Sequence, residues 1–130
     1  YNTYEGKIKM RILLVEDEKV LSNTIKDILK KDYEIDQAFD GIEAELYAKQ
    51  DIYDVIILDL MLPEKDGYQV LEDFYGKGYF VKMPIAVISG VEDMESIDKV
   101  NKYPIIDILA KPFNERDVER VVEKCLAAYF

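Results

Sequence analysis

Short apolar runs alternate with amphipathic segments along the whole chain. The runs lie at residues 11–15, 33–39, 54–59, 84–88 and 105–110, and each has the length of a strand. Four of them are mostly apolar, which is typical of strands buried on both faces of a sheet. The run at 33–39 mixes polar with apolar positions, which indicates a strand near an edge.

The segments between the runs carry apolar residues three and four positions apart, which predicts helices with one buried face. Five strands alternating with five helices predict a doubly wound α/β fold with a parallel sheet. The last helix is the strongest, because Asn114 can cap its start and an apolar stripe extends to Tyr129. The helix at 93–102 is the weakest, since its apolar anchors are only Met94, Ile97 and Val100. We therefore expect residues 93–102 to pack loosely and to shift.

Composition excludes several classes of protein. The chain has 130 residues with 27 Asp and Glu against 17 Lys and Arg, a net charge of −10. That length fits one domain. The acidic balance, without a basic cluster, argues against direct contact with nucleic acid or with an anionic membrane. The longest uncharged stretch, Met83–Val91, is far shorter than the ~18 residues that a membrane span needs.

The sequence contains no His and one cysteine, Cys125. A histidine-based catalytic dyad or zinc site is therefore excluded, as is an internal disulfide. A single unpaired cysteine fits a reducing compartment, so we expect a cytoplasmic location.

The first nine residues stand apart from the alternating pattern. The chain begins at Tyr1, and Met10 directly precedes the first apolar run. We expect residues 1–9 to be an N-terminal extension or an expression remnant; the end of a preceding domain is the alternative.

Residues whose side chains could take part in binding or catalysis end or follow four of the five predicted strands. Glu16 and Asp17 follow the first, and Asp59, Ser89 and Lys111 end or follow the third, fourth and fifth. Ligands bind beyond the carboxyl ends of the strands in such sheets. At an effective dielectric constant of ~20, two charges ~4 Å apart repel by ~4 kcal/mol, so three carboxylates at this edge require a cation. Oxygen ligands without imidazole or paired thiols favour Mg²⁺ or Mn²⁺.

Taken singly, each of these residues has an ordinary interpretation as a helix-start acid, a turn, a cap or a surface charge. Together they supply a carboxylate nucleophile, a divalent-cation site, a lysine and a hydroxyl. That combination is suited to phosphoryl transfer onto a carboxylate.

Four segments resemble the receiver domain of two-component response regulators: Ile12–Glu18, Asp54–Gly67, Pro84–Gly90 and Leu109–Phe113. The resemblance covers the chain from about Arg11 to Ala128, and residues 10–130 are identified with this domain. It implies a flavodoxin-like (βα)₅ fold with strand order 2-1-3-4-5. It also implies a cis peptide bond between Lys111 and Pro112.

The same resemblance implies a metal site. Asp17 and Asp59 would bind Mg²⁺ directly, Met61 would contribute its backbone carbonyl, and Glu16 would act through water.

The resemblance further implies a signalling role rather than that of an enzyme. Asp59 would accept a phosphoryl group from the phosphohistidine of a sensor histidine kinase or phosphotransfer protein. Lys111 would pair with Asp59 and then with the phosphoryl group, and Ser89 would hydrogen-bond to a phosphoryl oxygen. The 93–110 face would then switch conformation, and the 93–128 face is a candidate homodimer surface.

The chain departs from the family pattern in several places. Ile108 stands where the family usually has Tyr or Phe, and an isoleucine has no ring to swing inward. Signalling would then rely on shifts of loops and helices. The connection Tyr75–Met83 is unusually aromatic, and we expect these rings to serve packing; contact with a partner is the alternative.

Three alternatives have specific sequence requirements. An Asp-dependent phosphohydrolase resembles Asp-x-Asp, but Met61 occupies the second acidic position. A flavodoxin needs a Ser/Thr/Gly-rich phosphate loop where this chain has Glu16–Lys19, whose acids would repel a phosphate. A receiver that binds partners without phosphorylation is opposed by the intact set of strand-end residues.

Overall fold

Five parallel strands form the central sheet. The computed structural model describes residues 2–4, 7–90 and 98–130, with side chains from Lys9 onward. The sheet order is β4-β3-β5-β6-β7, which is 2-1-3-4-5 when only these strands are counted, as predicted. The strands are β3 (Arg11–Val15), β4 (Glu34–Ala38), β5 (Val55–Asp59), β6 (Ile85–Ser89) and β7 (Ile108–Ala110).

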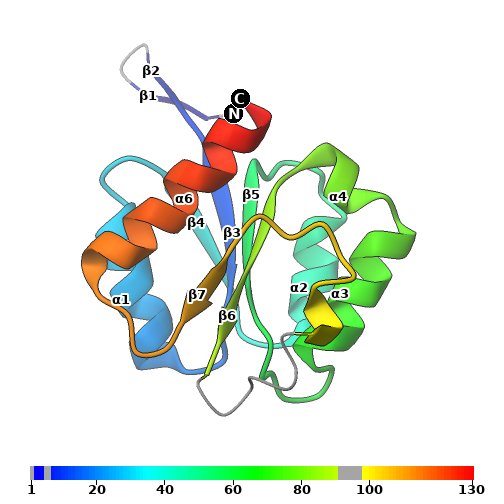
Figure 1. Cartoon of the computed structure of the whole chain (residues 1–130). Helices are drawn as coiled ribbons and strands as arrows, with labels where there is room; N and C mark the ends of the chain where they lie inside the picture. Colours follow the sequence, from blue (N-terminus) through cyan, green and yellow to red (C-terminus); the bar gives the residue numbers. More distant parts are fainter. Residues whose placement is uncertain (1, 5–6, 91–97) are drawn as a thin grey trace.

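Helices cover both faces of the sheet (Figure 1). One apolar cluster joins the sheet to α1 (Lys19–Leu29) and α6 (Glu115–Tyr129). The other joins it to α2 (Gly41–Ala48), α3 (Gly67–Gly76) and the short α4 (Tyr79–Lys82). The two clusters together make a three-layer α/β/α molecule with the sheet in the middle.

The central strands are apolar on both faces because both faces are covered. In β3, Ile12 and Leu14 belong to the cluster under α1 and α6, whereas Leu13 and Val15 belong to the cluster under α2 and α3. Strand β4 lies at an edge and is only partly buried up to Ala38, so its mixed pattern was interpreted correctly.

Helix α6 has the predicted start and buried stripe. The Asn114 side chain accepts a hydrogen bond from the Asp117 N–H, and the Asp117 side chain accepts one from the Asn114 N–H. This reciprocal pair satisfies two N–H groups that a helix start otherwise leaves unpaired. The buried residues are Val118, Val121, Val122 and Cys125, whereas Tyr129, where the predicted stripe ends, is 37% exposed.

Three features were not predicted from the sequence. Residues 2–4 and 7–9 form two paired antiparallel strands, β1 (Asn2–Tyr4) and β2 (Lys7–Lys9), outside the central sheet. Helix α4 lies within the aromatic connection. Strand β7 is shorter than the run 105–110, although the Ile106 N–H donates to the Ile85 carbonyl.

The aromatic connection packs as expected. Phe80 stacks on Tyr103 with ring centroids 6.0 Å apart, and Tyr75 lies 5.6 Å from Tyr103. The Tyr129 hydroxyl donates to the Phe80 carbonyl, which joins the end of α6 to α4.

The predicted helix at 93–102 falls partly outside the described residues, which resume at 98; residues 98–100 are helical. Within the described part of the chain, no helix combines the length and apolar character needed to cross a membrane.

Candidate functional site

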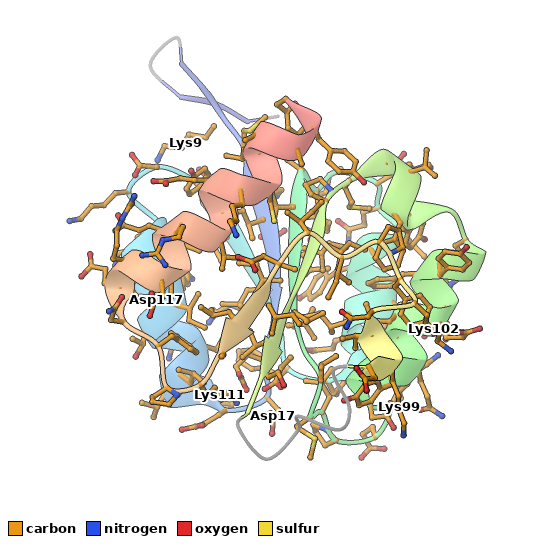
Figure 2. All side chains as sticks on the ribbon, in the orientation of Figure 1. Lys9, Asp17, Lys99, Lys102, Lys111 and Asp117 are labelled. Atoms are coloured by element: carbon orange, nitrogen blue, oxygen red, sulfur yellow. The ribbon has the colours of Figure 1, made fainter. Side chains whose placement is uncertain are left out.

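Strand register brings the sequence-predicted site residues to one edge of the sheet. Asp59 ends β5 beside Ile88, and Ser89 ends β6 beside Ala110. Asp17 and Lys111 lie at the same end of the sheet (Figure 2). Parallel strands carry their carboxyl ends to a common edge, which explains why residues so distant in sequence meet there.

Three carboxylates form the centre of this edge. Oxygen atoms of Glu16, Asp17 and Asp59 lie within 4.8 Å of one another. Glu16 and Asp59 are each only 1% exposed, whereas Asp17 is exposed. The cluster is therefore embedded in the protein on one side and open to solvent on the side of Asp17.

Lys111 supplies positive charge beside the cluster. Its Nζ lies 3.4 Å from Asp59 Oδ2 and 3.7 Å from Glu16 Oε1. Burial lowers the pKa of Lys111, but the charges of Asp59 and Glu16 outweigh it and raise the pKa above its ordinary value. The ammonium therefore stays charged at neutral pH, yet one lysine balances only part of the negative charge that the three acids can carry.

The surroundings of Glu16 reflect the excess of negative charge in the cluster. Its Oε2 accepts a hydrogen bond from the Glu18 N–H at 3.1 Å, but its buried Oε1 has no hydrogen-bond partner within the described residues. Burial and the adjacent Asp59 carboxylate raise the pKa of Glu16 to about 8. A divalent cation at the cluster would reduce the repulsion between the carboxylates and would give Oε1 a partner, either the ion or its bound water. An all-oxygen donor set suits Mg²⁺. The residues present therefore fit this ion.

The loop after β5 orients the Asp59 side chain. The Met61 N–H donates to Asp59 Oδ1 at 2.9 Å, which leaves Oδ2 toward Lys111. Gly67 allows α3 to begin against this loop, because a Cβ there would lie 2.5 Å from the Asp59 backbone oxygen. The Met61 side chain is 59% exposed beside the site.

Ser89 and Lys111 are joined through the backbone. The Lys111 N–H donates to the Ser89 carbonyl at 2.8 Å, and the buried Ser89 hydroxyl donates to the Gly90 carbonyl at 3.3 Å. The Lys111–Pro112 peptide bond is cis, as expected.

Sequence reasoning missed two residues that shape this edge, Lys65 and Gly41. The Lys65 ammonium pairs with Glu45 and Asp73, and the Lys65 backbone packs against Gly41. No local signal indicates these contacts, because they depend on how α2, α3 and the loop pack together.

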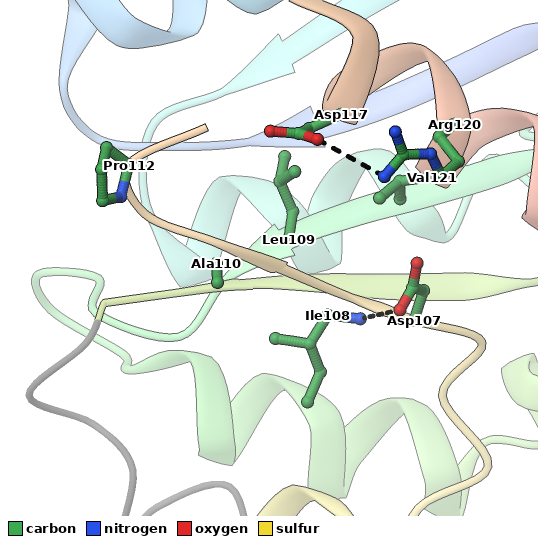
Figure 3. A pocket seen from close by; sticks show the side chains of 8 residues that line it. All are labelled: Asp107, Ile108, Leu109, Ala110, Pro112, Asp117, Arg120 and Val121. Carbon is green, nitrogen blue, oxygen red and sulfur yellow. Dashed lines mark hydrogen bonds and ion pairs between the residues drawn. The ribbon is translucent and has the colours of Figure 1, made fainter. Parts of the chain in front are cut away.

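A cavity of about 300 Å³ lies apart from the acidic cluster, between β7 and α6 (Figure 3). Within its wall, the Ile108 N–H donates to Asp107 Oδ1, and Arg120 pairs with Asp117 at 3.5 Å. Ile108 packs against the apolar cluster that joins the sheet to α2 and α3.

Comparison with known proteins points to one family. The family profile described as the response regulator receiver domain matches residues 12–123. The transcriptional regulatory protein CiaR of Streptococcus pneumoniae is 36% identical over 117 residues, covering 90% of this chain and 51% of that protein. The regulatory protein VanRB of Enterococcus faecalis is 32% identical, covering 92% of this chain and 53% of that protein. The chain thus spans about half the length of these relatives.

Solved structures agree with this result. The receiver domain of Francisella response regulator 1452 has a TM-score of 0.80 and 26% identity, covering 92% of this chain and 99% of that one. The chemotaxis response regulator CheY4 of Vibrio cholerae, at 23% identity, shares the fold with a TM-score of 0.82, covering 91% and 99% of the two chains. The chain therefore belongs to the response regulator receiver domain family.

Proposed function

We propose that this domain is a phosphoacceptor in a two-component or phosphorelay pathway, with Asp59 receiving the phosphoryl group. The donor would be the phosphohistidine of a sensor histidine kinase or of a phosphotransfer protein. One observation carries the proposal: a buried carboxylate at a strand end has two further acids beside it and the Lys111 ammonium 3.4 Å away. The domain would turn over only its own phosphoryl group, which makes it a signalling module rather than an enzyme.

In the proposed reaction, an Asp59 oxygen attacks phosphorus. The bond from phosphorus to the histidine nitrogen breaks, and its electron pair stays on the imidazole of the donor. Met61 keeps Asp59 oriented through its N–H, while Lys111 would neutralise a phosphoryl oxygen. Such a site contributes chiefly positioning and charge neutralisation.

Asp17 and Asp59 would hold Mg²⁺ or Mn²⁺ directly and Glu16 would do so through water, with the Met61 backbone carbonyl as a further ligand. When bound, the ion supplies charge neutralisation for the transferring group.

Ser89 would couple phosphorylation of Asp59 to a conformational change elsewhere in the domain. Its hydroxyl would leave the Gly90 carbonyl and donate to a phosphoryl oxygen. Because Ser89 and Lys111 are bonded through their backbones, the change would reach β7 and the 93–110 face. The 93–128 face, which includes the cavity between β7 and α6, is the surface proposed for homodimer formation.

Intact mass spectrometry after incubation with acetyl phosphate and Mg²⁺ tests the proposal. We expect one added phosphoryl group, absent in Asp59→Asn and in the presence of EDTA. Asp27→Asn, at an exposed acid of α1, is the matched control and should be modified normally. Absence of the adduct, together with unchanged amide spectra on adding beryllofluoride, would overturn the proposal.

A further inference from the structure

The loop at residues 60–66 is tied to two helices through one side chain. Lys65 Nζ lies 2.9 Å from Glu45 Oε2 on α2 and also pairs with Asp73 on α3. The side chains of Lys65 and Glu45 are only 26% and 18% exposed. Shielding of this kind makes the pair stronger than an ordinary exposed ion pair.

The Lys65 backbone also packs closely against α2. A Cβ on Gly41 would lie 2.2 Å from the Lys65 carbonyl oxygen, so the loop rests directly on the first turn of α2. Leu60 and Leu62 are buried in the core on the same side. The loop therefore has anchors at both ends, Asp59 in the sheet and Lys65 between the helices.

Between these anchors lies Met61, whose backbone N–H orients the Asp59 side chain. The Met61 N–H donates to Asp59 Oδ1, so a displacement of the loop would release this oxygen and move the Met61 carbonyl. We propose that Lys65 is a positioning residue, whose ion pairs to α2 and α3 hold Met61 in the place that Mg²⁺ binding at Asp59 requires. This inference rests on the proposed function of the acidic cluster.

The direction in which one substitution changes Mg²⁺ affinity distinguishes a positioning role of Lys65 from a purely electrostatic one. Lys65→Met removes a positive charge and makes the domain more negative. A purely electrostatic effect would therefore tighten Mg²⁺ binding. Loss of positioning would weaken it instead. Lys82→Met is the matched control, because Lys82 loses the same charge from an exposed pair with Asp51, 3.6 Å apart.

Two readouts by amide NMR test the inference without any phosphoryl donor. In metal-free protein, the Met61 amide proton shift reports its hydrogen bond to Asp59. We expect it to change in Lys65→Met, to stay unchanged in Lys82→Met, and to be restored in Lys65→Arg. In a Mg²⁺ titration of the full chain, we expect Kd to rise about tenfold in Lys65→Met, near the lower end of the effect of outer-shell substitutions.

The combined variant Glu45→Gln, Asp73→Asn keeps Lys65 but removes its partners. It should reproduce the Met61 shift change seen in Lys65→Met, which guards against a folding defect peculiar to one substitution. Equal or tighter Mg²⁺ binding by Lys65→Met, with its Met61 shift unchanged, would overturn the inference alone. Failure of the unaltered chain to bind Mg²⁺ would overturn the proposed metal site and this inference with it.

Discussion

At the scale of single residues, two tyrosine hydroxyls with opposite surroundings show how burial and bonding combine. The Tyr68 hydroxyl is buried and has no hydrogen-bond partner in the part of the chain that the structure describes. The Tyr103 hydroxyl donates to Glu72, and burial together with this bond raises the pKa of Tyr103 to about 12. A buried polar group without a partner lowers stability, whereas a bonded one contributes to it.

Tyr68→Phe should therefore raise the free energy of unfolding by about 1 kcal/mol, because it removes only the unpaired hydroxyl. The ring and its contact with the Lys99 ammonium, 6.0 Å from the ring centroid, are retained. Tyr103→Phe, the matched control, should lower stability by about 1 kcal/mol, since it removes the hydrogen bond from this hydroxyl to Glu72. Urea unfolding of both variants checks this, and a loss of stability in Tyr68→Phe would contradict it.

At the scale of elements, close backbone contact holds the site loop against the helices. Gly41 begins α2 directly against the Lys65 carbonyl, with Val70 of α3 also within reach of any added side chain. By contrast, a Cβ on Gly76, at the end of α3, would meet no atom within 4 Å among the described residues. The two glycines thus differ in packing although both lie in helices.

Gly41→Ala should lower the free energy of unfolding by about 2 kcal/mol, as overpacking of a tight contact does. Gly76→Ala should instead raise it by about 0.5 kcal/mol, because alanine restricts the unfolded chain more than glycine does. Thermal or urea unfolding of the two variants measures the difference. Equal effects of the two substitutions would contradict the close packing of α2 on the loop.

At the scale of the whole molecule, several groups hold their protons more tightly in the folded state. Burial raises the pKa of Cys125 from its ordinary value of 9.0 to about 12, and Tyr103 and Lys111 are shifted in the same direction. Above about pH 9 the folded protein therefore binds more protons than the unfolded chain. By linkage, stability must fall as the pH rises through this range.

The free energy of unfolding, measured with urea, should thus be lower at about pH 10.5 than at about pH 8. The stabilisation that Cys125 contributes is fully present below the pKa of its thiol in the unfolded chain and is lost as the pH rises above it. Cys125→Val keeps an apolar side chain in the α6 interface and should show a smaller fall between the two pH values. A fall of the same size in both proteins would exclude the thiol as a contributor.

The periodic pattern of the sequence was enough to predict the sheet and most helices. A strand covered on both faces is apolar over most of its length, so β3 can be recognised from the four adjacent apolar residues Ile12–Val15. Helix α6 can be predicted because its N-cap and its apolar stripe lie within one continuous segment. The pattern did not predict the strands β1 and β2 or the helix α4, which are too short to show a period.

The candidate site was predictable for a different reason. Glu16, Asp59, Ser89 and Lys111 lie at the carboxyl ends of parallel strands, and the topology alone brings such ends to one edge. The sequence by itself thus determined the layers, the strand order through its family resemblance, and the residues that meet at the site. Only the tertiary structure decided that Lys65 lies between Glu45 and Asp73, and that the buried Glu16 Oε1 faces Lys111 without a hydrogen-bond partner among the described residues. The Lys65 contacts depend on the packing of α2 and α3 on the sheet, whereas the surroundings of Glu16 depend on the alignment of the strand ends. Both bring together side chains that are far apart in sequence, and no local pattern specifies such contacts.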